Sequence, residues 1–281
     1  MVDGLAWLER ARARSAAVDA AVGVVQRERL VATGILAAAL AFRLFALLVP
    51  LAYLLVAGIG LTLGSAGRAS EDELSDLVVD SIAAVARTSE RGRLIALVVG
   101  GFATLAAAGG VVEVLRWIHV LAWRLAPRRQ RRNPWLVVGL VAGVVLVFGA
   151  SAGAERARAA ASGLANELTV LLTSAAVQVV LLAVLWVALS WALPRPAVPW
   201  TALVPGALLF AGGFLAYNLA LTVYFAPRAA RASAVYGSLG VALVLLVSLF
   251  LFGRLAVAAA ELNATMWERR AQRRRPSAPP P

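Results

Sequence analysis

The chain has 281 residues, of which 61% are hydrophobic, well above the ~45–50% apolar share of a typical soluble domain. Its net charge is +12, and all 27 basic residues are Arg. The chain has no Cys and a single His, His119, so a disulfide framework and a metal site built from several His or Cys ligands are excluded. We therefore expect no metal and no cofactor.

The apolar residues are concentrated in long runs. Each run is at least about as long as the ~20 residues that a helix needs to cross a bilayer core. The six stretches without a charged residue are 44–67, 94–112, 133–154, 168–194, 196–227 and 232–253. We predict an all-α fold, a polytopic membrane helix bundle with six transmembrane helices over residues 30–266, plus amphipathic surface helices.

Residues 1–29 form a charged, weakly amphipathic lead-in before the first apolar run. Trp7, Leu8, Ala11 and Val18 fall roughly on one helical stripe. This pattern indicates either a helix lying on the cytoplasmic membrane surface or an ordinary solvated helix. The first apolar run starts too late and is too long for the apolar region of a cleavable signal peptide.

The first membrane helix is expected over about 30–63. It contains Arg43 in mid-run and Pro50 near its centre. Proline removes one backbone hydrogen bond, so we expect a kinked or broken helix. Residues 64–92 then leave the membrane, and apolar residues at helical spacing predict an amphipathic helix near 70–88 on the outer surface.

The remaining elements follow in chain order. Helices are expected over 94–115 (continuing to 125), 134–151, 168–192, 201–225 and 236–266. Residues 152–166 read as a short polar connection and 194–199 as a tight turn, while Pro205, in the first turns of the fifth helix, is a second candidate helix break. Residues 267–281 are basic and Pro-rich, and we expect a disordered cytoplasmic tail.

The Arg residues are unevenly distributed between the two sides of the membrane. If the N-terminus is cytoplasmic, the inside segments hold 17 Arg and the outside segments 8, with Arg43 and Arg254 inside the spans. This bias predicts that the N- and C-termini are both cytoplasmic. It also explains the basic charge, so we expect the lipid bilayer as partner and no nucleic acid.

Polar residues inside spans are costly and are therefore candidates for function. Arg43 and Arg254 are expected near the midplane, and an Arg does not lose its proton in a protein. Their charges need carboxylates, carbonyls, water or a bound anion. The candidate residues for a substrate cavity are Arg43, Gln178, Asn218, Arg254, Glu261 and Asn263.

Two interpretations of these residues stay open. In the first, the first and sixth helices meet, and Arg43, Arg254 and Glu261 line one polar cavity that accepts an anionic group. In the second, the polar residues form a structural hydrogen-bonded network that locks the helices together. Glu113 and Arg116 are three residues apart and can pair locally, and His119 is expected at the membrane interface.

Two segments carry a family resemblance. Residues 33–60 contain the run Ala37–Ala41 followed by Pro50, and residues 236–264 contain Tyr236 and Gly237, then an apolar helix that ends in Glu261, Leu262 and Asn263. A VPW-x-x-x-x-PG segment lies at 198–206. In this order and spacing they resemble the YihY / virulence factor BrkB family of bacterial inner-membrane proteins. The chain departs from the family pattern at Arg43, where an aromatic residue is usual, and at Ala260, where a glycine is usual.

The resemblance implies six spans, the bacterial inner membrane, and transport or lipid export. Some family members have carried a ribonuclease label, but the acidic cluster at 71–80 falls on the predicted outer surface and gives no support to a nuclease, so we expect no enzyme. One hypothesis is a transporter or flippase of an anionic or amphipathic molecule, such as a lipid. The alternative is a non-transporting membrane organiser or scaffold that acts through its basic cytoplasmic segments.

Overall fold

The computed structural model describes residues 33–63, 90–126, 133–160 and 163–273. All regular structure in these ranges is helical, and the ranges contain no strand. Six helical segments are long and apolar enough to cross a membrane. The prediction of an all-α bundle with six membrane-spanning helices is therefore confirmed. The expected lead-in at 1–29 and outer helix near 70–88 lie outside the described residues.

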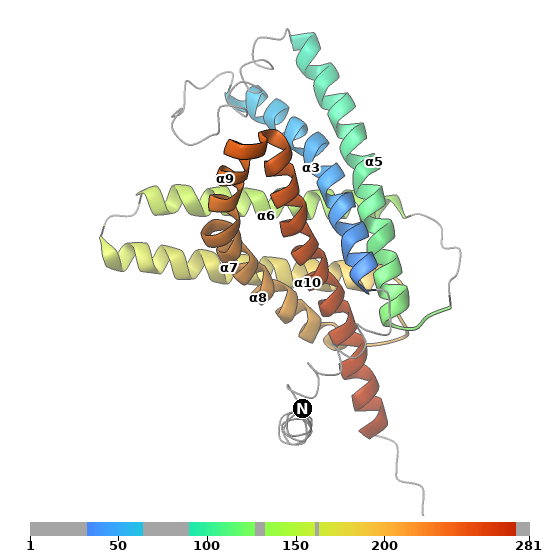
Figure 1. Cartoon of the computed structure of the whole chain (residues 1–281). Helices are drawn as coiled ribbons and strands as arrows, with labels where there is room; N and C mark the ends of the chain where they lie inside the picture. The colour runs from blue at the N-terminus through green and yellow to red at the C-terminus, as the bar shows by residue number, and fades with distance from the viewer. Residues whose placement is uncertain (1–32, 64–89, 127–132, 161–162, 274–281) are drawn as a thin grey trace, which may run out of the picture.

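The six long helical segments contact one another in a closed order, which we call the ring. In Figure 1, α6 and α7 run roughly across the direction of α3, α5 and α10. Helix α5 packs on α3, α3 on α10, α10 on α8, α8 on α7, α7 on α6, and α6 returns to α5. Their bounds are α3 Thr33–Leu63, α5 Glu90–Ala122, α6 Pro134–Ala160, α7 Leu164–Ala192, α8 Val204–Ala220 and α10 Ser238–Arg273. Helix α10 also contacts α5 directly.

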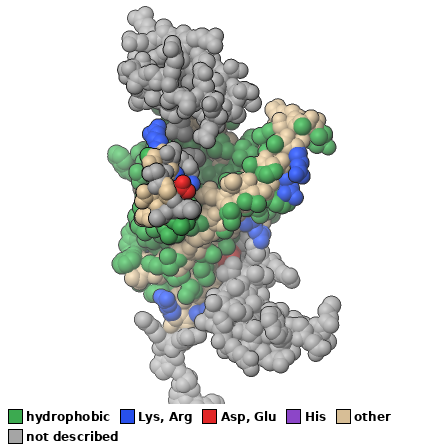
Figure 2. Space-filling view, turned by 90° about the vertical axis from the view of Figure 1, so that its left-hand side faces the viewer, with side chains coloured by type: hydrophobic (Ala, Val, Ile, Leu, Met, Phe, Trp, Pro, Cys, Tyr) green, Lys and Arg blue, Asp and Glu red, His purple; other side chains and the backbone are tan. Residues whose placement is uncertain are grey.

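Apolar side chains occupy both the interior and the outer surface of the ring. The buried core draws on all six helices and includes Leu40, Val111, Leu140, Trp186, Phe210 and Val257. Large apolar side chains such as Phe102, which is 72% exposed, also face outward. Figure 2 shows apolar side chains over most of the described part of one face. An outward apolar surface of this kind is what a lipid environment requires.

Small residues allow the helices to approach closely. A Cβ built on Gly253 of α10 would lie 2.5 Å from the carbonyl oxygen of Ala37 in α3, so only glycine fits at this contact. In membranes such close packing stabilises helix pairs that gain little from the hydrophobic effect. The expected meeting of the first and sixth helices is therefore confirmed.

The ends of several helices differ from the sequence prediction. The expected connection at 152–166 is largely helical, because α6 continues to Ala160 and α7 begins at Leu164. This segment is rich in Ala, the strongest helix former, which outweighs its three charged residues. The fifth segment continues past α8 through a π-turn, η2 (Leu221–Phe225), into α9 (Ala226–Tyr236). Pro227 lacks an N–H for the regular helical bond, which accounts for the irregular turn before it.

Neither proline interrupts a helix. Helix α3 continues through Pro50, because a proline removes only one hydrogen bond and the flanking turns keep theirs. Pro205 lies in the first turn of α8, where its missing N–H has no intrahelical partner to lose. The prediction of a break at these two positions is therefore corrected, whereas a kink of α3 at Pro50 stays a prediction.

Helix α10 ends later than the expected start of the tail at 267. It runs to Arg273, and Trp267 packs against a small apolar cluster that includes Trp123, Leu203 and Ala264. The apolar surface of Trp267 holds the additional turns in place. Residues 274–281 of the expected tail lie outside the described residues.

Candidate functional site

Arg43 lies at the contact between α3 and α5. It is at the midpoint of the candidate span Gly34–Ala52 and faces Gly110, which lies next to the midpoint of the span Leu97–Ala122. A Cβ built on Gly110 would be 3.0 Å from the Arg43 Cδ and 3.1 Å from its Nη1. The Arg43 side chain therefore lies along α5 over a position that has no side chain of its own.

The Arg43 side chain is exposed at the outer surface of the ring. Among the described residues it forms no ion pair and no hydrogen bond. Leu40, Arg43 and Leu47 are three and four residues apart, so Arg43 borders the buried stripe that Ala37, Leu40 and Leu47 form.

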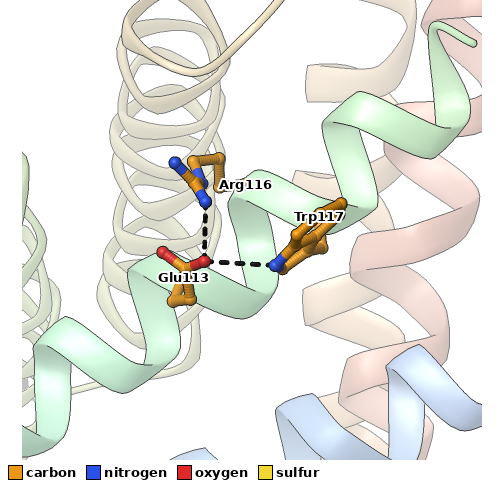
Figure 3. Close-up of polar contacts among 3 residues, drawn as sticks. All are labelled: Glu113, Arg116 and Trp117. Carbon is orange, nitrogen blue, oxygen red and sulfur yellow. Dashed lines mark hydrogen bonds and ion pairs between the residues drawn. The ribbon is translucent and has the colours of Figure 1, made fainter. Parts of the chain in front are cut away.

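A second polar group lies on α5, three to seven residues beyond Gly110. Arg116 donates a hydrogen bond from Nη2 to Glu113 Oε1 at 2.7 Å, and Trp117 Nε1 donates to the same oxygen at 3.1 Å (Figure 3). The expected local pair of Glu113 and Arg116 is confirmed. We call Glu113, Arg116 and Trp117 the α5 trio.

Arg254, Glu261 and Asn263 all lie on α10 but not on one face. Arg254 and Glu261 are seven residues apart and share a face, whereas residues two apart, such as Glu261 and Asn263, point in nearly opposite directions. Glu261 is 2% exposed and Asn263 is 1% exposed; Arg254 is half-buried. A single cavity shared by Arg43, Arg254 and Glu261 stays a prediction.

Asn263 connects α10 to the start of α8. Its Oδ1 accepts a hydrogen bond of 2.6 Å from the backbone N–H of Gly206, and no side chain local to α8 caps this end. Asn263 therefore satisfies one of the N–H groups that every helix start leaves without a partner. A Cβ at position 206 would lie 2.2 Å from the Ala259 carbonyl oxygen, so glycine is required. The PG segment and the residues around Glu261 and Asn263, 57 residues apart, thus meet in space.

Tyr236 and Gly237 form the reversal between α9 and α10. Gly237 has φ +60° and ψ −144°, a conformation open essentially to glycine alone. Its N–H closes the end of α9 by donating to the Ser233 carbonyl at 2.8 Å. A Cβ at Gly240 would lie 2.4 Å from the Ala232 carbonyl oxygen, so the first turn of α10 lies close against α9. The role of these residues is structural, and Tyr236 itself is exposed.

Gln178 and Asn218 lie in different parts of the ring. Gln178 Nε2 donates to Ser151 Oγ at 3.1 Å, which ties α7 to α6. The carbonyl of Asn218 accepts a hydrogen bond of 3.1 Å from Thr222 Oγ1 at the start of the π-turn. Gln178 and Asn218 therefore have no hydrogen-bond partner in common among these contacts.

A buried polar pair was missed by sequence reasoning. His119, expected at the interface, is 1% exposed. Its Nδ1 lies 2.9 Å from the Leu115 carbonyl oxygen and its Nε2 lies 3.2 Å from Ser190 Oγ. A carbonyl only accepts, so in the neutral ring Nδ1 carries the proton and the Ser190 hydroxyl donates to Nε2. The pair joins α5 to α7, and its members are 71 positions apart in the sequence, so no local pattern indicated it.

Aromatic rings fill the interior beside this pair. Trp186 stacks on Phe210 with 4.2 Å between ring centroids, and Phe210 meets Phe252 edge to face at 5.5 Å. Such contacts add to the stabilisation from burial alone. The row links α7, α8 and α10 across the centre of the ring.

Comparison with known proteins identifies the family. A family model described as Virulence factor BrkB matches residues 31–281. No curated protein and no solved structure matches the chain. The match includes all six candidate spans and both segments that meet at Asn263. This multi-pass membrane protein belongs to the BrkB virulence factor family.

Proposed function

We propose that this protein moves an anionic amphipathic molecule, such as an acidic lipid, across the bilayer, and that Arg43 contacts its charged group in the middle of the membrane. The position of Arg43 is the observation that carries the proposal. An Arg at mid-depth costs ~2.5–3.5 kcal/mol on insertion scales. Within the described ranges no carboxylate pairs with Arg43 to offset this cost.

A bound anion would supply the missing partner. The guanidinium group offers several N–H donors in a planar fork that matches the oxygen atoms of phosphate or carboxylate. Gly110 allows the Arg43 side chain to lie directly against α5, because it presents no side chain at the contact. The neighbouring Phe42, which is 62% exposed, provides an apolar surface for a hydrocarbon chain.

The packing of the ring favours a route along its outer surface. Trp186, Phe210 and the core around them occupy the interior, whereas Arg43 is exposed on the outside. An amphipathic substrate can keep its chains in lipid while its charged group passes Arg43. We further propose the bacterial inner membrane and cytoplasmic termini, on the basis of the Arg bias between the two sides.

Transport can be measured in proteoliposomes with a fluorescent acidic phospholipid and an impermeant quencher. Loss of a hydrogen bond to a charged group costs about 1.5–3 kcal/mol, so Arg43→Leu should slow transfer about ten- to 150-fold. Arg43→Lys should retain part of the rate. Arg228→Leu, which removes an exposed Arg on α9, is the matched control and should leave the rate unchanged. Equal rates for the wild type and Arg43→Leu would favour the membrane-organiser alternative.

A further inference from the structure

The α5 trio lies on the outward side of its helix. Trp117 is 39% exposed, and the side chain of Glu113 is 37% exposed, while that of Arg116 is 20% exposed. Phe102 and Leu121 on the same helix are also exposed. In Figure 3 the three side chains project from α5 and converge on the Glu113 carboxylate. The trio therefore lies on the side of α5 away from its buried stripe, which includes Val111, Leu115 and Ile118.

Together with Arg43, the trio forms a series of polar residues that extends from Gly110 toward the C-terminal end of α5. At a rise of ~1.5 Å per residue, Glu113 lies ~5 Å from the midpoint of the α5 span and Trp117 ~11 Å from it. The half-thickness of the bilayer core is ~15 Å. Arg43, Glu113, Arg116 and Trp117 thus provide polar groups from mid-depth to the level where indole rings meet the lipid headgroups.

An outward-facing ion pair at this depth calls for an explanation beyond helix stability. Charged side chains within the core are costly and mark binding sites or transport paths. Counting Arg43, these positions hold two positive charges and one negative charge. Glu113 Oε1 accepts from both Arg116 and Trp117, which are the donors that a phosphate oxygen would use.

We infer that the α5 trio is a docking site for the phosphate of an acidic phospholipid, and that Glu113 holds the two donors in place until the lipid replaces it. The inference rests on the proposed function in taking this lipid as the transported molecule. The phosphate accepts from the Arg116 guanidinium and the Trp117 indole N–H, and the acyl chains lie against the exposed apolar residues of α5. Glu113 acts as a competitor for the docking site, so removing its charge should strengthen lipid binding.

The test is phosphatidylglycerol binding to the full chain in detergent, measured by native mass spectrometry with phosphatidylcholine as reference. Arg116→Gln should weaken phosphatidylglycerol binding about fivefold, the contribution of one Arg near an anionic lipid surface. Glu113→Gln should tighten it about two- to fivefold, as expected for loss of one exposed ion pair. Arg228→Gln removes an Arg that lies on Tyr224 of α9 and should change nothing. Arg116→Lys retains the charge and tests the site if Arg116→Gln does not fold.

Opposite effects of Glu113→Gln and Arg116→Gln, with no effect of Arg228→Gln, would support the inference. Weaker binding in both α5 variants would overturn it, because the pair would then act as one structural unit. An equal loss in Arg228→Gln would also overturn it in favour of general charge attraction. Displacement of the lipid by millimolar inorganic phosphate would show a site for free anions instead. Binding in detergent requires no translocation, so intact phosphatidylglycerol binding by a wild-type protein that transfers no lipid in proteoliposomes would refute the proposed function alone.

Discussion

The free energy of unfolding of the Arg43→Leu variant distinguishes a functional from a structural role of Arg43. A structural role predicts a decrease, whereas a functional role predicts no change or an increase. In a buried structural network, removing one charged partner leaves the other uncompensated and costs about 3–5 kcal/mol. Arg43 is exposed and forms no ion pair within the described part of the chain. Its replacement loses the contact between the Arg43 side chain and Gly110 but also removes a charge that costs ~2.5–3.5 kcal/mol at mid-depth. We therefore expect the free energy of unfolding to stay unchanged or to increase.

The assay is reversible unfolding of the purified protein in mixed micelles with increasing fraction of a denaturing detergent, followed by circular dichroism. Arg43→Leu should unfold at the same or a higher detergent fraction than the wild type. Arg43→Ala serves as a control for the lost side-chain volume and should behave in the same direction. A decrease of about 3 kcal/mol or more in the free energy of unfolding would refute the reasoning and establish Arg43 as part of a structural network.

Further predictions follow from the close contacts and the Arg bias. Asn263→Ala should lower the free energy of unfolding by about 0.5–2 kcal/mol through loss of the α8 cap. Gly206→Ala should lower it by about 1–3 kcal/mol because of the clash with α10. An unchanged free energy of unfolding for either variant in the same micelle titration would exclude the contact. Gly237→Ala should cost about 1–3 kcal/mol through its backbone conformation, and unchanged thermal stability would contradict the tight reversal. Cysteines introduced at Ser75 and Gln130 in this Cys-free chain should be labelled by an impermeant reagent on intact cells at position 75 only; labelling at position 130 would reverse the orientation.

The architecture could be predicted because every helix that crosses a bilayer requires a long run of apolar residues. Each span needs about 20 apolar residues, and the charge-free runs correspond to the six candidate spans. Helix ends were less predictable. Glu155, Arg156 and Arg158 suggested a connection, but the Ala residues around them keep α6 helical to Ala160, since charged residues are compatible with a helix that extends beyond the bilayer core.

The site was only partly predictable. A sequence shows how deep a residue lies in a membrane more readily than it shows which way the side chain points. Counting residues predicts that Arg43 lies near the midplane. Its exposure depends on which stripe of α3 packs against α5 and α10, and the partner helices determine that stripe. The contacts of Asn263 with Gly206 and of His119 with Ser190 join residues 57 and 71 positions apart, and no local pattern announces such pairs.

The most direct test of the central claim is to find where a lipid headgroup contacts the protein during transport. A phospholipid with an acidic, photoactivatable headgroup would be cross-linked to the protein in proteoliposomes, and the modified residues would be mapped by mass spectrometry. We predict adducts in the middle of α3 and α5, near Phe42 and Gly110, and their loss in Arg43→Leu. Adducts confined to the helix ends in the wild-type protein would contradict passage of the charged group past Arg43.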